Sequence, residues 1–129
     1  MEQKIVVHMK GGVIHKGITH DFEPASPSFH LLPAEGGGVP FRVQVGSMKA
    51  LFWVKDYLGN REFVARQNFG ADHLEKRKAI LTFEDGETLW GTVEGEESSS
   101  GIFVVPADER DNNIRIFVPR TSVKDLRWV

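Results

Sequence analysis

An internal repeat is the feature that most constrains the fold of this chain. Residues 4–33 and 78–106 carry the same succession of apolar runs and glycines. Gly12 matches Gly86 and Gly17 matches Gly91 at an offset of 74 (86 − 12 and 91 − 17), and residues 29–35 then match 102–108 at an offset of 73 (102 − 29). A repeat of this length marks two similar structural units, so we expect an internal duplication.

The match continues to the end of both copies. Arg42 aligns with Arg115 and Val45 with Val118, and residues 51–54 align with 126–129 as a Leu-x-Trp-Val segment. We therefore predict a first unit at residues 1–54, a second unit at 77–129, and a linker at 55–76. We also expect the tryptophan of each Leu-x-Trp-Val segment to anchor the last strand of its unit.

Each copy carries the pattern of five short strands. Residues 79–84 alternate in the period of a half-buried strand, and Asp85-Gly86 is a strong hairpin signal. Gly17 and Gly91 fall inside the second strand, where a bend or a close backbone approach requires glycine. Further strands are expected at 29–32, 41–45 and 51–54, and at 102–105, 114–118 and 126–129, with one helical turn at 47–50 and at 121–124. These patterns predict an all-β fold in which each copy curls on itself.

Composition narrows the class of protein. The chain has 129 residues and no cysteine, which excludes disulfides and thiolate metal sites. It contains no apolar run of the roughly 20 residues that a membrane helix needs, and its start does not read as a secretory signal. We therefore expect a cytoplasmic protein without membrane contact. Units of about fifty residues are marginal alone, so the two copies should pack on each other.

The charge of the chain is uneven. Its net charge is −2, and residues 77–129 hold seven Lys and Arg against ten Asp and Glu. The acidic residues fall in expected turns, such as Glu94 and Asp111. Acidic turns repel a phosphate backbone, which argues against nucleic-acid binding.

Each copy resembles the Sm/LSm fold, a five-stranded SH3-like barrel. The likeness lies in Leu81, Phe83, Asp85-Gly86 and Gly91, and in a second motif at residues 117–123. The whole tandem also resembles an uncharacterised bacterial domain that occurs alone or beside PilZ and response-regulator domains. The resemblance implies two tandem five-stranded Sm/SH3-like barrels and a role in bacterial signalling.

The sequence departs from the functional motifs of these families. Sm-like RNA binders carry an Asn before strand three and an Arg-Gly pair after strand four, whereas this chain has Ser100-Gly101 and Pro119-Arg120 there. PilZ domains use Arg-x-x-x-Arg followed by Asp-x-Ser, whereas Arg61 and Arg66 are five residues apart and no Asp-x-Ser follows. Neither binding activity is therefore carried over by the resemblance.

No catalytic or cofactor motif is recognisable. Four histidines occur in the first copy, but the residues aligned with them are Thr82, Leu89, Glu94 and Phe103, which favours structural or surface roles over a metal site. The serines at 98–100 have no His or Asp at a spacing that implies activation. We therefore expect a non-enzymatic protein without metal or cofactor.

The linker is too apolar for a free spacer, because it contains Tyr57, Phe63 and Phe69. We expect it to be ordered and to lie across the seam between the two units.

These inferences favour an interaction or regulatory module that binds a protein partner through a sheet edge or through the seam. The candidate surface residues are Lys16, Trp90, Arg110, Arg115 and Arg120. The alternatives are Sm-like RNA binding and a small-ligand or second-messenger sensor that uses Arg61, Arg66 and Arg77. Self-association also remains open.

Overall fold

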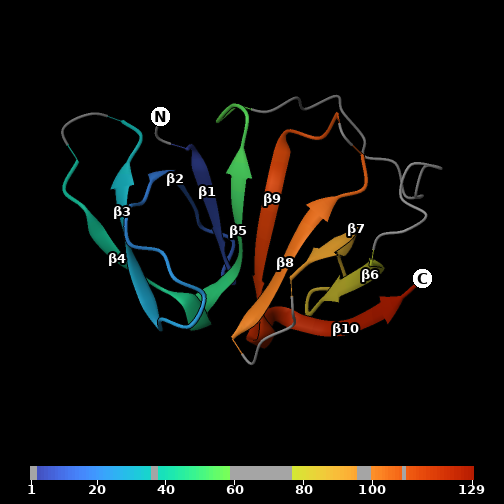
Figure 1. Ribbon diagram of the computed structural model, residues 1–129. Coiled ribbons are helices and arrows are strands. Elements are labelled where there is room, and N and C mark those ends of the chain that lie inside the picture. Colours follow the sequence, from blue (N-terminus) through green and yellow to red (C-terminus); the bar gives the residue numbers. More distant parts are fainter. Residues whose placement is uncertain (1–2, 36–37, 59–76, 96–99, 109) are drawn as a thin grey trace.

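The computed structural model describes residues 3–35, 38–58, 77–95, 100–108 and 110–129 (Figure 1). All regular structure in these residues is strand or 3-10 turn, which confirms the prediction of an all-β protein. No helix in the described residues is long and apolar enough to span a bilayer. The elements are β1 (Ile5–Met9), β2 (Ile14–Ile18), β3 (Ser28–Pro33), β4 (Phe41–Gln44), η1 (Val45–Ser47), β5 (Met48–Val54), β6 (Lys78–Phe83), β7 (Thr88–Glu94), β8 (Gly101–Pro106), β9 (Asn113–Pro119), η3 (Arg120–Ser122) and β10 (Val123–Trp128).

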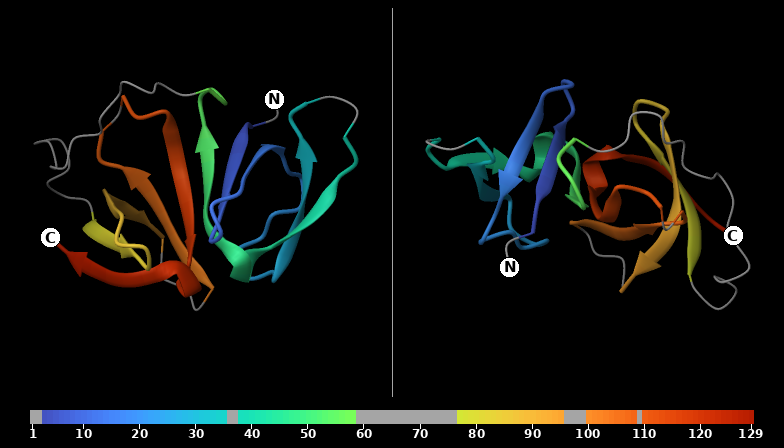
Figure 2. Two further views of the ribbon diagram at one scale, coloured as in Figure 1. Left: turned by 180° about the vertical axis from the view of Figure 1, so that it is seen from behind. Right: turned by 90° about the horizontal axis from the view of Figure 1, so that it is seen from above.

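The ten strands form one antiparallel sheet in the order β10-β6-β7-β8-β9-β5-β1-β2-β3-β4. The first half, β1–β5, and the second half, β6–β10, therefore have the same internal order, because 5-1-2-3-4 matches 10-6-7-8-9. The halves lie side by side as two curled lobes with β5 and β9 between them (Figures 1 and 2). The sheet does not close, since its end strands β10 and β4 are not paired with each other in the described residues.

Strand registers repeat as well as strand order. Ile5 pairs with Gly17 and with Trp53, while Ala79 pairs with Gly91 and with Trp128. The pairings β1–β5 and β6–β10 also share an irregularity at the same place, beside the 3-10 turn. The predicted alignment of strands one, two, three and five is confirmed.

The predicted alignment of strand four is wrong by two residues. In the strand-three to strand-four hairpins, His30 pairs with Arg42 and Phe103 pairs with Phe117. Arg42 therefore occupies the place of Phe117 rather than Arg115, and Val43 rather than Val45 occupies the place of Val118. The cause is the spacing between matched positions: Arg42 follows Pro33 by nine residues (42 − 33), whereas Phe117 follows Pro106 by eleven (117 − 106).

The predicted glycine positions are explained by two constraints. Gly12 and Gly86 turn the first hairpin of each half with φ of 94° and 92°, a conformation that favours glycine. A Cβ added to Gly17 would collide with the carbonyl oxygen of Leu32, and one added to Gly91 would collide with that of Val105. The close backbone approach expected in strand two is therefore present in both halves.

Each half has its own apolar core, and each core takes a side chain from the other half. Phe117 of β9 is fully buried in the core of the first half, among residues such as Val7 and Leu51. Ala50 of β5 is fully buried in the core of the second half, with Leu81 and Ile116. Strands β5 and β9, paired along Leu51–Val54, thus form a wall that is buried on both faces. Burial of this kind joins the halves into one cooperative unit.

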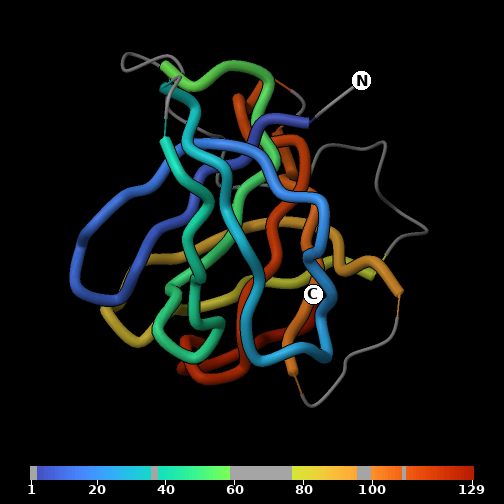
Figure 3. Tube along the Cα trace, turned by 90° about the vertical axis from the view of Figure 1, so that its left-hand side faces the viewer, coloured from blue at the N-terminus to red at the C-terminus, as the bar shows by residue number. Residues whose placement is uncertain are grey.

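Polar contacts join the halves at the end where the β1–β2 and β6–β7 turns lie on the same side of the molecule (Figure 3). The Nζ of Lys49 lies 2.7 Å from a carboxylate oxygen of Asp85 and 3.3 Å from one of Glu87. Lys10 Nζ donates to the carbonyl of Thr121 at 3.0 Å, and Ser122 Oγ donates to the carbonyl of Lys49 at 2.5 Å. These bonds fix the first half against the second at the edge of the seam.

The start of the linker touches both halves. The backbone N–H groups of Lys55 and Asp56 donate to Asn112 of the second half at 2.9 and 3.1 Å. Tyr57 donates its hydroxyl to the carbonyl of Gly17 in the first half at 2.9 Å. Phe63 and Phe69 lie outside the described residues, so the expected path of the rest of the linker remains a prediction.

The two matched tryptophans differ in their surroundings. Trp53 packs against the core of the first half and against Phe22, with ring centroids 5.7 Å apart. Trp128 is 44% exposed and is covered by the guanidinium of Arg77 at 4.7 Å. The anchoring role expected of both residues is seen for Trp53 and is much weaker for Trp128.

Candidate functional site

Two strands of the sheet have a pairing partner on one side only. These are β4 and β10, the two ends of the strand order in the described residues. Half of the backbone N–H and C=O groups of such an edge strand point away from the sheet and can pair with another chain. The two edges are therefore the first places to look for a binding surface.

The outer face of β10 carries charged residues. Asp125 and Arg127 are exposed there, and by register they correspond to Ala50 and Phe52 of β5. Charges on an edge strand are a recognised way to prevent further strand pairing. The β10 edge therefore has the chemistry of a strand that ends the sheet.

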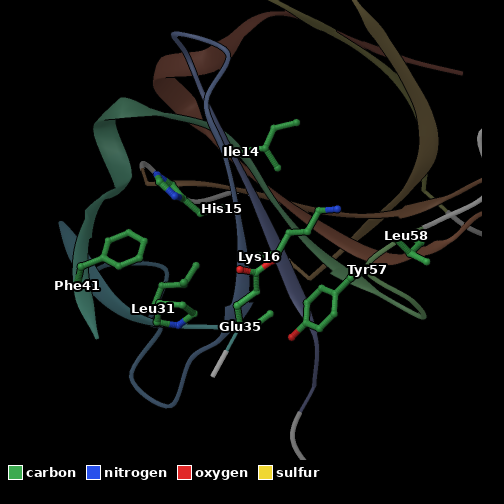
Figure 4. A pocket seen from close by; sticks show the side chains of 10 residues that line it. Ile14, His15, Lys16, Leu31, Glu35, Phe41, Tyr57 and Leu58 are labelled. Atoms are coloured by element: carbon green, nitrogen blue, oxygen red, sulfur yellow. The ribbon is translucent and has the colours of Figure 1, made fainter. Parts of the chain in front are cut away.

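The β4 edge lies beside a cleft of about 570 Å³, which we call the β2–β4 cleft (Figure 4). This volume is typical of ligand and peptide-side-chain pockets. Phe41 and His15 lie at one end of the cleft and Tyr57 and Leu58 at the other (Figure 4). Its lining residues are Ile14, His15, Lys16, Leu31, Pro33, Ala34, Glu35, Phe41, Tyr57 and Leu58.

Strand pairing explains why the cleft opens at this place. Residues 14–16 of β2 pair with β1, but β2 pairs with β3 only at Gly17 and Ile18. Strand β3 then pairs with β4 from Ser28 to Leu31. The sheet therefore divides between β2 and β4. The His15 and Phe41 rings meet across this gap in an edge-to-face contact with centroids 4.9 Å apart.

The floor of the cleft is apolar and its rim is polar. Leu31 is fully buried, whereas Lys16 and Glu35 are exposed at the rim. Arg42 adds a second exposed cation on the outer face of β4, next to the cleft. The edge and the rim thus present two cations, Lys16 and Arg42, each of which can pair with a carboxylate of a ligand.

The outer face of β3 holds a second polar pair close to this edge. His30, the cross-strand neighbour of Arg42, lies 2.7 Å through Nδ1 from the carboxylate of Asp21. The backbone N–H of His30 also donates to Asp21 at 2.9 Å. These two hydrogen bonds lower the pKa of the Asp21 carboxyl.

The five residues predicted as a binding surface are not brought together. Lys16 lines the β2–β4 cleft, while Trp90 lies half-buried at the corresponding position of β7, opposite Ile80. Arg120 lies in η3 and lines a separate open cleft of about 530 Å³ between the loops of the two halves. Only Lys16 therefore belongs to the site at the β4 edge.

Arg110 and Arg115 have structural contacts. Arg110 donates from Nε and Nη2 to the carboxylate of Asp108 at 3.1 and 3.0 Å, and these hydrogen bonds raise the pKa of Arg110. The guanidinium of Arg115 lies 3.9 Å from the ring centre of Phe103 and 3.2 Å through Nε from Glu94. Asp108 is only 2% exposed. Arg110 thus makes its contact within the second half, whereas Arg115 also lies over the ring of Trp53 in the first half at 5.3 Å.

Of the three arginines of the small-ligand alternative, only Arg77 lies among the described residues. Arg77 donates to the carbonyl of Gly95 at 2.6 Å and stacks on Trp128. Arg61 and Arg66 lie outside the described residues, so their proposed role remains a prediction. In the part of the chain that is described, no group of three His, Cys, Asp or Glu residues could hold a metal ion.

Sequence reasoning missed Phe41, His15 and Tyr57 as members of one site. Their juxtaposition depends on the division of the sheet between β2 and β4, which periodicity does not reveal. One signal was available, because the aligned residues of the second copy are the apolar Leu89 and Trp90 where the first has His15 and Lys16. The first copy is thus more polar at the cleft.

One family model matches the chain over residues 1–129, and its description is a family of unknown function (DUF6982). No curated protein matches the chain, and no solved structure matches it.

Proposed function

We propose that this chain, which belongs to the DUF6982 family, is a non-enzymatic interaction module that binds a protein partner by strand addition at β4. One observation carries the proposal. Strand β9 pairs with β5 on its outer side, and β4, its equivalent in the first half, has no strand there in the described residues. A regulatory role in cytoplasmic bacterial signalling is part of the proposal, and its support is the resemblance of the repeat to domains that accompany PilZ and response-regulator domains.

Each half is proposed to be a five-stranded Sm/SH3-like unit that arose by duplication. The support is the repeated strand order, the repeated registers of β1–β2 and β6–β7, and the 3-10 turn before the last strand of each half. In this view β5 and β9 join two units edge to edge, and the same kind of edge is offered to the partner by β4.

The chemistry of the cleft supports binding rather than catalysis. The Tyr57 hydroxyl donates to a backbone carbonyl, and the His15 ring packs on Phe41. An activated nucleophile requires a base within hydrogen-bonding distance. The hydrogen bond of Tyr57 to a backbone carbonyl and the ring contact of His15 with Phe41 are not contacts of that kind.

A photo-crosslinking experiment in bacterial cells tests the proposal. The residue p-benzoylphenylalanine is placed at Gln44, which is exposed on β4, and in a matched control at Asp125, which is exposed on β10. We expect a discrete protein adduct from the β4 position and none from the β10 position. Mass spectrometry then identifies the captured protein and the segment of it that is cross-linked.

Two results would reject the proposal. One is equal labelling from both edges or from neither. The other is retention of random RNA by the purified chain with a steep loss of binding as salt rises, which is the signature of phosphate contacts. The first result removes the strand-addition mechanism, and the second replaces the partner with nucleic acid.

Binding of a small molecule in the β2–β4 cleft is the second candidate function. The cleft volume of about 570 Å³ and its apolar floor support it. A thermal-shift screen with nucleotides and acidic metabolites tests it. A ligand that stabilises the chain, and whose effect is lost in the Lys16→Glu variant, would favour this candidate over the first.

A further inference from the structure

The strand that already pairs with a strand-four edge in this molecule is β5. In the β5–β9 pair, Phe52 lies opposite Ile116 and Leu51 lies opposite Phe117. The hairpin registers place Phe41 of β4 at the position of Ile116, and Arg42 at the position of Phe117. The pairing of β5 with β9 is therefore a template for any strand that adds to β4.

The template assigns a face to each residue of an incoming strand. A residue at the place of Phe52 would lie opposite Phe41, on the side of the sheet that leads into the β2–β4 cleft. A residue at the place of Leu51 would lie opposite Arg42 on the exposed outer face. The first site is apolar and aromatic, whereas the second is cationic.

From this juxtaposition we propose that the β4 edge recognises an extended, antiparallel segment of a partner protein in which an acidic residue is followed directly by an aromatic residue. The aromatic side chain packs on Phe41 and His15 at the cleft, and the carboxylate pairs with Arg42. Lys16 at the rim adds to the attraction for acidic segments. The inference rests on the proposed function and specifies the chemistry of its partner.

A second copy of the chain does not fit this edge. Of its two edge strands, β10 carries Leu126 and Arg127 at the places of Leu51 and Phe52. Pairing by the template would place Leu126 opposite Arg42 and would bring Arg127 to the cleft beside Lys16. Asp125 would meet Val43, which is almost fully buried. Each of these juxtapositions is unfavourable. The other edge strand, β4, has the sequence FRVQ and offers no carboxylate to Arg42, so the occupant is a different protein.

Synthetic peptides taken from β5 test the inference on the full chain. The probe is a fluorescein-labelled peptide of residues 47–55 that carries L51E, and the controls are the unsubstituted peptide and a peptide of residues 122–129. By fluorescence anisotropy at 100 mM salt, we expect the L51E peptide to bind about threefold more tightly than the unsubstituted one, as one cross-strand charge pair would give. The 122–129 peptide should bind most weakly.

A charge exchange identifies the contact without disturbing the fold, because Arg42 is exposed. The Arg42→Glu chain should lose the preference for the L51E peptide and should prefer a peptide that carries L51K. Hydrogen exchange should slow in residues 41–44 when the L51E peptide is bound, and it should not slow in β10.

The inference falls if neither the L51E peptide nor the unsubstituted peptide of residues 47–55 binds at up to 1 mM. It also falls if Arg42→Glu leaves the preference for the L51E peptide unchanged. It also falls if the purified chain self-associates and the 122–129 peptide breaks the assembly, which would make a second copy the occupant. A partner cross-linked at Gln44 through a segment that lacks an acidic-aromatic pair would overturn the inference while the proposed function stands.

Discussion

Strands β9 and β4 hold the same place in the two halves, yet among the described residues β9 pairs on both sides and β4 on one. The two strands differ in the outward-facing side chain at a matched position. Phe117 of β9 is fully buried in the core of the first half, whereas its counterpart Arg42 is exposed. The backbone pattern is the same in both cases. What decides whether the edge joins the two halves is thus the chemistry of the outward-facing residues.

Strands β5 and β10 show the same relation between outward-facing residues and strand pairing. Ala50 and Phe52 of β5 face the second half, and Ala50 is fully buried there. The corresponding residues of β10 are Asp125 and Arg127, which are exposed. One strand thus continues the sheet and the other ends it. This resembles the way in which repeat proteins place polar residues on their terminal units.

The largest loss of stability is expected when Ala50 of β5 is replaced by aspartate, the residue that β10 has at the equivalent position. The Ala50→Asp variant places an unpaired carboxylate in the core of the second half. An uncompensated buried charge costs about 5 kcal/mol at the upper end of the usual range. We expect urea denaturation at pH 7.5 to show a largely unfolded chain or a free energy of unfolding reduced by that amount.

The matched control for Ala50→Asp is Asp125→Ala, which removes the charge at the equivalent exposed position. Its free energy of unfolding should stay within about 0.5 kcal/mol of the wild-type value, as for other surface substitutions. Similar losses in the two variants would mean that the outer faces of β5 and β10 are not in different surroundings.

The next effect in size concerns Phe117 and Arg42. Phe117→Ala leaves a cavity in the core of the first half although the residue belongs to the second, and it should cost about 3–4 kcal/mol. Because the two cores share the β5–β9 wall, we expect one cooperative urea transition that shifts as a whole. Tryptophan fluorescence, which reports on Trp53 of the first half and on Trp90 and Trp128 of the second, should coincide with circular dichroism.

Arg42→Ala at the equivalent position should change the free energy of unfolding by less than about 0.5 kcal/mol. Two separate transitions in the Phe117→Ala variant would contradict the shared wall, because the halves would then unfold independently.

The sequence predicted much of this fold for physical reasons that can be named. Glycines 17 and 91 mark close approaches of the backbone, which no other residue tolerates, so they reveal the repeat directly. The alternation of Leu81, Thr82 and Phe83 reveals a half-buried strand. Such local constraints leave a mark in the sequence near the residue that they act on.

The pairing of β5 with β9 and the β2–β4 cleft have no comparable signal in the sequence. The register of strand four was predicted two residues away from its actual position. The second half has two more residues between the matched positions of strands three and four, and Arg42 and Arg115 offered a false match. The pairing of β5 with β9 joins residues far apart in the chain, and an apolar strand such as β5 fits one buried face as well as two. The cleft depends on that tertiary arrangement, so of its residues only Lys16 was predicted as part of a binding surface.

A smaller effect on the free energy of unfolding is expected when the pH is lowered, because His8 lies at the seam between the halves. His8 of β1 faces Lys49 and Glu87, and its ring lies 4.7 Å from that of Phe52. Burial, and then the charge of Lys49, lower the pKa of His8, while Glu87 opposes the shift. The unfolded chain therefore takes up the proton first. The stabilising contribution of neutral His8 is complete above the unfolded pKa of about 6.5 and is lost as the pH falls toward the folded pKa.

The test compares urea midpoints at pH 7.5 and 5.5. The wild-type midpoint should be lower at pH 5.5, and His8→Gln, which cannot take up the proton, should lose part of this difference. The equivalent residue of the second half is Thr82, which pairs with the edge strand β10 and has no titratable side chain in this pH range. We therefore expect no matching pH effect from this position. An unchanged pH dependence in His8→Gln would place the acid sensitivity elsewhere.

The smallest effect on stability is expected when the outward-facing residues of β10 are replaced by those of β5. The same change should have a clear effect on assembly. Asp125→Ala combined with Arg127→Phe removes two exposed charges and creates an apolar edge that matches the one buried against β9. The free energy of unfolding of the monomer should change by less than about 0.5 kcal/mol, because both positions are exposed. Sedimentation velocity should nevertheless show dimers and longer species that grow with concentration, since β10 can then add to the β4 edge of another copy and this contact does not close on itself. Lys124→Ala on the same strand should stay monomeric. A double variant that is also monomeric at high concentration would show that the charges of β10 are not what ends the sheet.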